Sequence, residues 1–335
     1  MNVQKHLFDI IKSLIPEQYR LVDVVEDLLK ISQDSAYRRI RGEKELTLSE
    51  VQKLCRHYHL SMDEILNNEA KQGSAAEQDV LFQYMPIDAA NQPDCIRYLE
   101  RLSEPLTALS AVEDTEMFFT AQDIPFYHFL NHTELLYFKL YVWYDIATQS
   151  RISFREFCNR LDTTNIRPVY DRMYQAYLKI PSKEIWTNQT VDATLRSLDF
   201  YMEIGAFDNK EVAICLLNQL SKLLDTVNDH TQKGYKDNEK QIPFSMYICS
   251  VDMENNFMLT RHGNQCTCTI KLYTINNIVT SHAALCQEAE NWINDLLQKS
   301  VQISGRVSIR ERVRFFQTSK SKIEEQINKI EQAKR

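Results

Sequence analysis

The scarcity of glycine is the feature that most limits how this chain can fold. Six glycines occur among 335 residues, which is under 2% of the chain, whereas proteins average about 7%. No two of them lie closer than 29 residues along the sequence. This spacing excludes motifs that need two nearby glycines, such as dinucleotide-binding loops, phosphate-binding loops and the nucleophile elbow. Because glycine and proline both interrupt helices and only eight prolines occur, the composition also favours long helices.

Charge and cysteine usage limit the partners and the compartment. The formal net charge is −7, so a uniformly basic nucleic-acid binder is excluded and any contact with DNA must come from a local patch. The eight cysteines are scattered and form no C-x-x-C pair, which favours reduced thiols. The first residues lack the apolar segment of a signal peptide. The most apolar stretch, 135–147, is too short to cross a membrane. We therefore expect a cytoplasmic protein without a membrane partner.

The first 68 residues have the pattern of five short helices and form the first predicted domain. The expected helices are 3–15, 22–29, 33–41, 48–58 and 62–66. Ser32 is the expected cap of the third helix, and capping boxes beginning at Thr47 and Ser61 open the last two. Residues 69–79 contain no large apolar side chain and are predicted to be a linker.

Residues 80–335 form the second predicted domain, and their pattern is mainly helical. Between 244 and 280 the apolar period changes from 3.6 to 2, which predicts an antiparallel β-meander. Residues 116–121 are a candidate fourth strand, and helices resume at 283–299 and 308–334. The predicted fold class is mainly α, with a five-helix N-terminal domain and a larger α+β domain. This larger domain is expected to be mostly helical with a small antiparallel sheet.

Residues 22–66 resemble the helix-turn-helix of the lambda-repressor/Cro-like (Xre-type) family of DNA-binding domains. The resemblance rests on 31–43, which ends the third helix with an Arg-Gly pair, and on the capped segments 48–55 and 60–66. The sequence departs from the family at three positions. Glu26 occupies the position of a small residue, Lys30 occupies that of the turn glycine, and Arg39 occupies that of an apolar residue. The resemblance implies that 33–41 is the recognition helix and enters the major groove of DNA.

The candidate DNA contacts lie on this helix and beside it. Gln33 suits adenine and Arg38 suits guanine, because each side chain can form paired hydrogen bonds with that base. The other DNA-binding candidates are Ser32, Asp34, Ser35, Tyr37, Arg41 and Lys44. Residues 30–56 hold seven Lys or Arg against four acids, an excess of +3, which is typical of a groove-binding patch. The alternative is a small helical bundle with a solvated charged face.

Aromatic side chains are concentrated in 117–146, which holds ten of the 34 in the chain. One interpretation of such a cluster is a pocket for an apolar or aromatic effector. The candidate pocket residues are Phe118, Phe126, Tyr137, Tyr141 and Trp143. The pattern favours the other interpretation, a core or a dimer interface, because aromatic side chains are abundant in both.

Three further patterns have a chemical and a structural interpretation. His128 and His132 have metal-ligand spacing, and Cys266 and Cys268 share one strand face, but we interpret both pairs as packing residues. The stretch 305–335 carries a local charge of +5 and is either a second DNA-facing element or a surface helix. Its apolar stripe is predicted to begin at Ile309 and Val313. We predict no metal, no other cofactor and no catalytic residue, because no such pattern stands out.

Together these patterns predict a homodimeric, sequence-specific DNA-binding transcriptional regulator that is not an enzyme. One recognition helix reads too few base pairs for useful specificity, so two half-sites on double-stranded DNA are expected. The second domain would hold the dimer and bind an unidentified small-molecule effector. The alternative is a protein–protein interaction module whose N-terminal bundle binds a protein partner. Such an interface would favour apolar residues at the positions of Gln33, Arg38 and Lys44.

Overall fold

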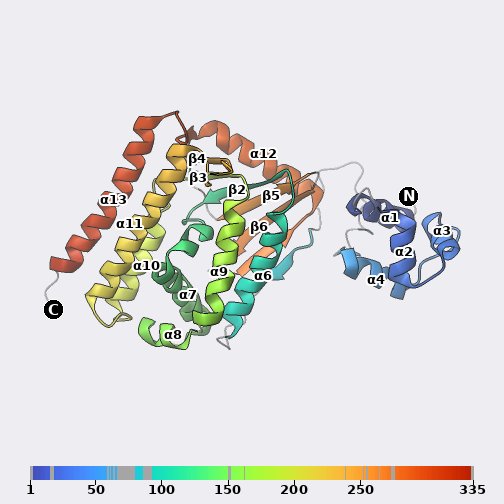
Figure 1. The fold of residues 1–335 in the computed structure, drawn as a ribbon, viewed down its shortest axis with the longest axis horizontal. Helices are drawn as coiled ribbons and strands as arrows, with labels where there is room; N and C mark the ends of the chain where they lie inside the picture. The colour runs from blue at the N-terminus through green and yellow to red at the C-terminus, as the bar shows by residue number, and fades with distance from the viewer. Residues whose placement is uncertain are drawn as a thin grey trace. The chain divides into compact units, whose positions relative to one another are not determined.

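The chain folds into two compact units, residues 1–82 and 83–335 (Figure 1). The structure is a computed structural model. It describes residues 3–15, 19–58, 60, 62, 65, 80–85, 93–149, 152–161, 163–237, 239–251, 253, 256–263, 265–272 and 276–332. The predicted linker, 69–79, and the capping box expected at Ser61 lie outside these residues.

The N-terminal unit is a bundle of short helices around one apolar core. Its helices are α1 (Val3–Leu14), α2 (Leu21–Leu29), α3 (Gln33–Ile40) and α4 (Leu48–Tyr58). Of the fifth predicted helix, the structure describes Met62 and Ile65, which are both helical. The helix α3 ends one residue before the predicted end. The buried core residues are Leu7, Phe8, Ile11, Val22, Val25, Leu29, Ala36, Leu54, Cys55 and Ile65.

Short-range hydrogen bonds set where these helices begin and end. The Ser32 hydroxyl accepts a hydrogen bond from the backbone N–H of Ser35. Thr47 and Glu50 each accept a hydrogen bond from the other's backbone N–H, so the predicted capping box forms. The C-cap of α2 is Lys30, whose φ of 55° lies in the left-handed region that glycine normally occupies. The turn between α2 and α3 therefore forms at the expected place although a lysine stands where the resembling family has glycine.

The C-terminal unit is built on an eight-stranded mixed sheet within the described residues. Its strands are β1 (Gln83–Met85), β2 (Thr115–Ala121), β3 (Ser182–Trp186), β4 (Phe244–Ile248), β5 (Phe257–His262), β6 (Gln265–Leu272), β7 (Asn276–Thr280) and β8 (Val301–Gln302). Their order across the sheet is β1-β7-β6-β5-β2-β3-β4-β8. The pairs β2–β3 and β3–β4 are parallel, and the other five pairs are antiparallel.

The prediction of a small antiparallel sheet is therefore wrong in both size and strand direction. An antiparallel meander forms within the predicted range from β5, β6 and β7, but β4, which lies in the same predicted range, is placed on the other side of β2 and β3. Parallel pairing is possible because long helical segments separate β2 from β3 and β3 from β4, which gives enough chain for a crossover. The strand β3 escaped prediction because it is five residues long and has Glu184 at its centre, which masks the apolar pattern of a buried strand.

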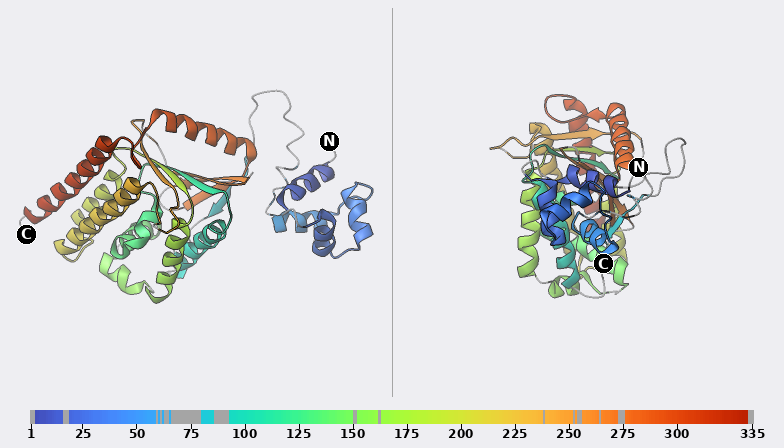
Figure 2. Two further views of the ribbon diagram at one scale, coloured as in Figure 1. Left: turned by 45° about the horizontal axis from the view of Figure 1, so that its top comes forward. Right: turned by 90° about the vertical axis from the view of Figure 1, so that its right-hand side faces the viewer.

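Helices cover both faces of this sheet. They are α6 (Pro93–Leu109), α7 (Thr133–Thr148), α8 (Phe154–Arg160), α9 (Thr163–Leu178), α10 (Asp192–Glu203), α11 (Lys210–Lys233), α12 (Ala283–Lys299) and α13 (Ile309–Gln332), together with the 3-10 helix η1 (Phe126–Asn131). Figure 2 shows α12 on one side of the sheet and the helical layer that contains α7, α9 and α11 on the other. No helix in the described part of the chain is both long enough and apolar enough to cross a membrane.

Alternation along the strands divides the core of this unit into two. Phe118 points to the α12 side, where it packs in a cluster with Ile293 of α12. Its neighbours Met117 and Phe119 belong to the larger core on the opposite side, which includes side chains of the other helices. Successive side chains of a strand point to opposite faces, so the sheet is the middle of three layers.

The C-terminal helix α13 packs against α11, but its first turn differs from the prediction. Ile309 and Val313 are 55% and 46% exposed, so they do not begin the buried stripe. Arg312 takes the inward position and donates hydrogen bonds of 2.8 Å to the carbonyl oxygens of Ile303 and Gly305. A buried guanidinium that satisfies backbone carbonyls thus replaces an apolar contact.

Candidate functional site

The helix α3 has an inner face and an outer face. Ala36 is fully buried and Arg39 is 4% exposed, whereas Asp34, Tyr37 and Arg38 are exposed. Because residues three apart lie on one side of a helix, this burial fixes which side chains α3 presents to solvent. The burial of Arg39 sets the rotational orientation of α3 in the bundle. Arg39 occupies the position where the resembling family has an apolar residue.

Arg39 belongs to the interior of the N-terminal unit. Its Nη2 donates to Glu50 Oε1 at 2.7 Å and its Nη1 donates to the carbonyl oxygen of Ser35 at 3.2 Å. Burial alone would raise the pKa of the Glu50 carboxyl, but the hydrogen bonds from Arg39 and from the Thr47 backbone outweigh it and hold the pKa below its usual value. The pair joins α3 to α4, so Arg39 is not available to a partner.

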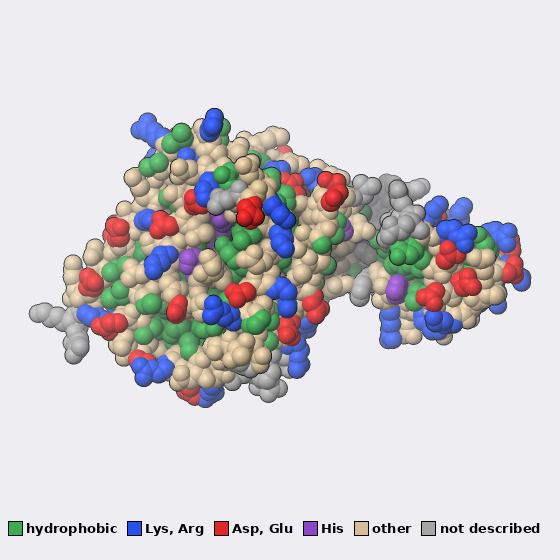
Figure 3. Space-filling model, viewed as in Figure 1, with side chains coloured by type: hydrophobic (Ala, Val, Ile, Leu, Met, Phe, Trp, Pro, Cys, Tyr) green, Lys and Arg blue, Asp and Glu red, His purple; other side chains and the backbone are tan. Residues whose placement is uncertain are grey.

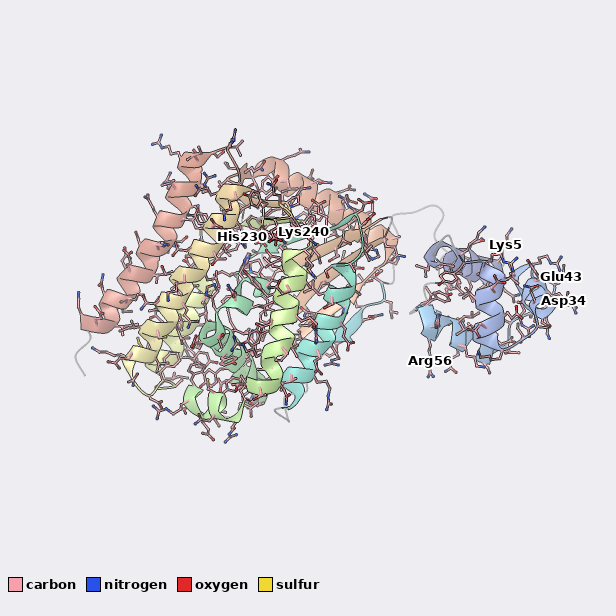
Figure 4. The ribbon with its side chains drawn as sticks, viewed as in Figure 1. Lys5, Asp34, Glu43, Arg56, His230 and Lys240 are labelled. Atoms are coloured by element: carbon pink, nitrogen blue, oxygen red, sulfur yellow. The ribbon has the colours of Figure 1, made fainter. Side chains whose placement is uncertain are left out.

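The predicted DNA contacts lie at α3 and the loop that follows it. Of these eight residues, Ser35 is half-buried. The other seven are exposed: Ser32, Gln33, Asp34, Tyr37, Arg38, Arg41 and Lys44. Figure 4 shows Asp34 and Glu43 at this edge of the unit, while Lys5 and Arg56 lie away from it. The Gln33 amide donates weakly to Asp23 Oδ1 at 3.4 Å, so a base edge can replace that contact.

Acidic side chains compete for the cations on this edge. Glu43 contacts Arg41 Nε at 3.2 Å and lies 4.0 Å from Arg38 Nε. When the interior pair Arg39–Glu50 is set aside, residues 30–56 keep six exposed cations and three exposed acids, so the excess of +3 remains. Figure 4 places Arg56 apart from Asp34, so the excess is spread over more than one face. Figure 3 shows the two signs of charge interspersed on the visible face of this unit.

The first part of the chain matches a known family. Residues 10–108 match the BetR domain, a helix-turn-helix-like DNA-binding domain family. The match covers α2, α3 and α4 and extends through most of α6. No curated protein and no solved structure matches the chain. The N-terminal part of the chain is therefore similar to helix-turn-helix-like DNA-binding domains, which is the broader class of the predicted type.

The C-terminal unit contains a cavity of about 140 Å³ between the sheet and the helical layer. Phe126 and Trp143 of the predicted effector pocket line it. The other three residues lie elsewhere. Phe118 faces the α12 side of the sheet, the Tyr141 hydroxyl donates to the carbonyl oxygen of Ile152, and Tyr137 packs edge-on against Tyr170. The five predicted pocket residues do not lie together in the structure, because a strand and a helix each distribute successive side chains over different faces.

The cavity also has a polar wall that the aromatic pattern did not predict. Asp123 Oδ2 accepts a hydrogen bond of 2.7 Å from Lys139 Nζ, and Oδ1 accepts from Thr194 Oγ1 and from the Ile124 backbone N–H. Burial alone would raise the pKa of Asp123, but the Lys139 charge is the strongest of the effects that outweigh it and keep the pKa below its usual value. Both carboxylate oxygens are therefore used within the fold. Lys271, from β6, also lines the cavity.

The two histidines with metal-ligand spacing have separate surroundings. His128 Nε2 lies 2.9 Å from Glu184 Oε2, and the same carboxylate accepts hydrogen bonds from the Tyr177 hydroxyl and the Trp186 indole. His132 follows η1, a 3-10 helix, in which the four-residue spacing does not align two side chains. Among the described residues, no group of three or more His, Cys, Asp or Glu is arranged to hold a metal ion. The Glu184 cluster joins β3 to η1 and α9.

The paired cysteines of β6 lie under α12. Cys268 is fully buried, and its Sγ lies 3.6 Å from the Sγ of Cys286 in α12. Cys266, Cys268 and Cys286 are all free thiols. The pKa of the Cys266 thiol is raised by a hydrogen bond with Cys286 and by burial, which disfavours the reactive thiolate. The thiols pack in the smaller core.

Proposed function

We propose that this protein is a sequence-specific transcriptional regulator that binds double-stranded DNA as a homodimer and does not catalyse a reaction. The observation that carries the proposal is the outer face of α3. Gln33, Tyr37 and Arg38 are exposed there while Arg39 is held inside by Glu50. The match of residues 10–108 to the BetR domain supports DNA as the partner.

In this proposal α3 enters the major groove. Its eight residues have a length suited to the groove, and side chains near the helix N-terminus reach base edges. Gln33 then reads a base, whereas Lys44, beyond the helix, contacts a phosphate. Two copies reading half-sites about one helical turn apart supply the specificity that one helix lacks. The C-terminal unit holds the dimer and contains the effector cavity.

The proposal is tested by binding-site selection with the full chain, followed by titrations at several salt concentrations. Gln33→Ala should relax the preference at one base position and lower affinity for the preferred site by about 5- to 150-fold, equivalent to about 1–3 kcal/mol. Lys44→Ala should weaken all sequences alike and lower the salt slope by about one. Lys5→Ala removes an exposed cation of α1 that is not among the predicted DNA contacts (Figure 4); it is the matched control and should change neither.

Three results would reject this docking of α3. The first is an absence of DNA binding at low salt. The second is a flat salt response, because contacts with phosphates release counterions. The third is an identical change of preference in Gln33→Ala and Lys44→Ala.

A protein partner is the second candidate function, and one surface residue favours it. Leu48, the first residue of α4, is 83% exposed, and a large exposed apolar side chain suits a protein interface. Leu48→Ser should leave DNA affinity unchanged if α3 alone docks. If the chain binds no DNA and Leu48→Ser abolishes association with a protein, the interaction module is the correct function.

A further inference from the structure

A lysine ammonium group lines the cavity of the C-terminal unit and has no hydrogen-bonding partner among the described residues. Lys271 lines the cavity from β6, and its Nζ lies 5.9 Å from the centre of the Trp143 ring. Within the described residues, the structure records no hydrogen-bond acceptor for Nζ and no carboxylate at ion-pair distance. The Lys271 side chain is half-buried, so its charge is partly removed from water and an anion beside it would be favourable.

The neighbouring charges do not supply that anion. Asp123 is the acid of this wall, and its two oxygens are occupied by Lys139, Thr194 and a backbone N–H. Asp123, Lys139 and Lys271 together carry a formal charge of +1. Burial lowers the pKa of Lys271, the Asp123 charge opposes this lowering, and the Lys139 charge adds a smaller lowering. A bound anion would stabilise the charged form.

The remainder of the cavity selects an apolar body of limited size. Its walls include Phe126, Trp143, Met173 and Phe257. A cavity of about 150 Å³ lined by apolar side chains is large enough for benzene, and this cavity measures about 140 Å³. Tyr127 adds a hydroxyl donor on the wall, because its present partner is the Met258 sulfur at 3.8 Å, which is a weak acceptor.

We propose that this cavity binds a small organic monocarboxylate, aromatic or branched and about the size of benzoate. The carboxylate pairs with Lys271, and the apolar body packs against Phe126 and Trp143. As the identity of an effector, this inference rests on the proposed regulatory function. The binding reaction itself requires only the C-terminal unit, so it is measurable without DNA.

The test is calorimetric titration of the full chain, without DNA, with benzoate, phenylacetate and 3-methylbutanoate. Each acid is paired with its neutral amide, which has nearly the same shape. At least one carboxylate should bind tenfold or more tightly than its amide, because a charge-assisted hydrogen bond is about twice as strong as a neutral one. Sodium chloride and sodium sulfate are added as inorganic anions and should not compete at equal concentration.

Two variants identify the anchoring group. Lys271→Met should weaken carboxylate binding tenfold or more, and Lys271→Gln, which keeps a donor but not the charge, should also lose affinity. Lys183→Met is the matched control. It removes a lysine whose Nζ pairs with Glu116 and lies 4.9 Å from the centre of the Phe118 ring, which faces the α12 side of the sheet. This control should bind the carboxylates as the parent protein does.

The inference is overturned if none of the three carboxylates shows binding at a ligand concentration of about 10 mM. Such a result would mean that the Kd is weaker than about 1 mM, the value that corresponds to a binding free energy of about −4 kcal/mol. Equal binding of acid and amide, or unchanged binding in both Lys271 variants, would also overturn it. Equal competition by sulfate would show that the site takes an inorganic ion only. Because DNA is absent from these titrations, each of these failures leaves the DNA-binding proposal untouched, and failure of DNA binding leaves the cavity result standing.

Discussion

Arg38 and Arg39 are adjacent arginines of α3, and we predict opposite consequences for their replacement by alanine. Arg39→Ala removes a guanidinium that is 4% exposed, together with its 2.7 Å contact to Glu50 and its hydrogen bond to the Ser35 carbonyl. Breaking a buried ion pair by removing one partner costs about 3–5 kcal/mol. The Glu50 side chain is 15% exposed and keeps its Thr47 contacts, which places the expected cost near the low end, about 3 kcal/mol.

This cost is large relative to the stability of the unit that carries it. A helical domain below about 70–80 residues rarely has more than 3–5 kcal/mol of stability, so Arg39→Ala should leave the N-terminal unit close to unfolding. Arg38→Ala should change stability by less than about 0.5 kcal/mol, as most surface substitutions do. Its side chain is 52% exposed, and its acidic neighbour Glu43 lies 4.0 Å away. Its effect should appear in affinity for the selected DNA site, by about 1–3 kcal/mol.

Hydrogen exchange followed by mass spectrometry on the full chain separates the two outcomes. Amides in the core of α2 and α4 should exchange more than a hundredfold faster in Arg39→Ala, because about 1.4 kcal/mol corresponds to a factor of ten. Peptides from α11 in the C-terminal unit are the internal control and should be unchanged. Equal protection in both variants, or unchanged protection in Arg39→Ala, would refute the assignment of Arg39 to the interior.

Three further predictions concern charge and pH. Glu43→Gln removes the acid that contacts two arginines of the DNA-facing edge. DNA affinity should therefore rise several-fold in titrations, and the salt dependence of binding should become steeper. Unchanged affinity would exclude competition by this acid. The lowered pKa of Glu50 gives the N-terminal unit stability that is lost as pH falls below about 4.5, the usual pKa of Glu; circular dichroism at α-helix wavelengths should show this loss shifted in Arg39→Ala. Burial lowers the pKa of both His132 and His230 to about 4 from 6.5, so the C-terminal unit should lose stability as pH falls from about 6.5 to about 4. Urea unfolding monitored by tryptophan fluorescence measures this unit alone, because all three tryptophans lie in it, and a pH-independent midpoint would contradict the burial of both rings.

The sequence by itself determined the features that depend on neighbours within about one turn of helix. The capping residues Ser32 and Thr47 mark the starts of α3 and α4, and α12 occupies the predicted range, 283–299. The αL position at Lys30 was also in the expected place. Caps and amphipathic periods act over three or four residues, so they are readable from the order of residues alone.

Tertiary structure decided which residues share a face or a cavity. The resemblance places Arg39 at a position that is apolar in the family, but only the tertiary contact with Glu50 of α4 makes Arg39 half of an interior pair while Arg38 stays a surface cation. Likewise, β2 and β3 became parallel neighbours across four helical segments, and the cavity joined Asp123 to Lys271 from distant parts of the chain. Burial, strand direction and cavity shape depend on contacts between segments that are remote in sequence, because each is a property of the packed arrangement and not of any one element.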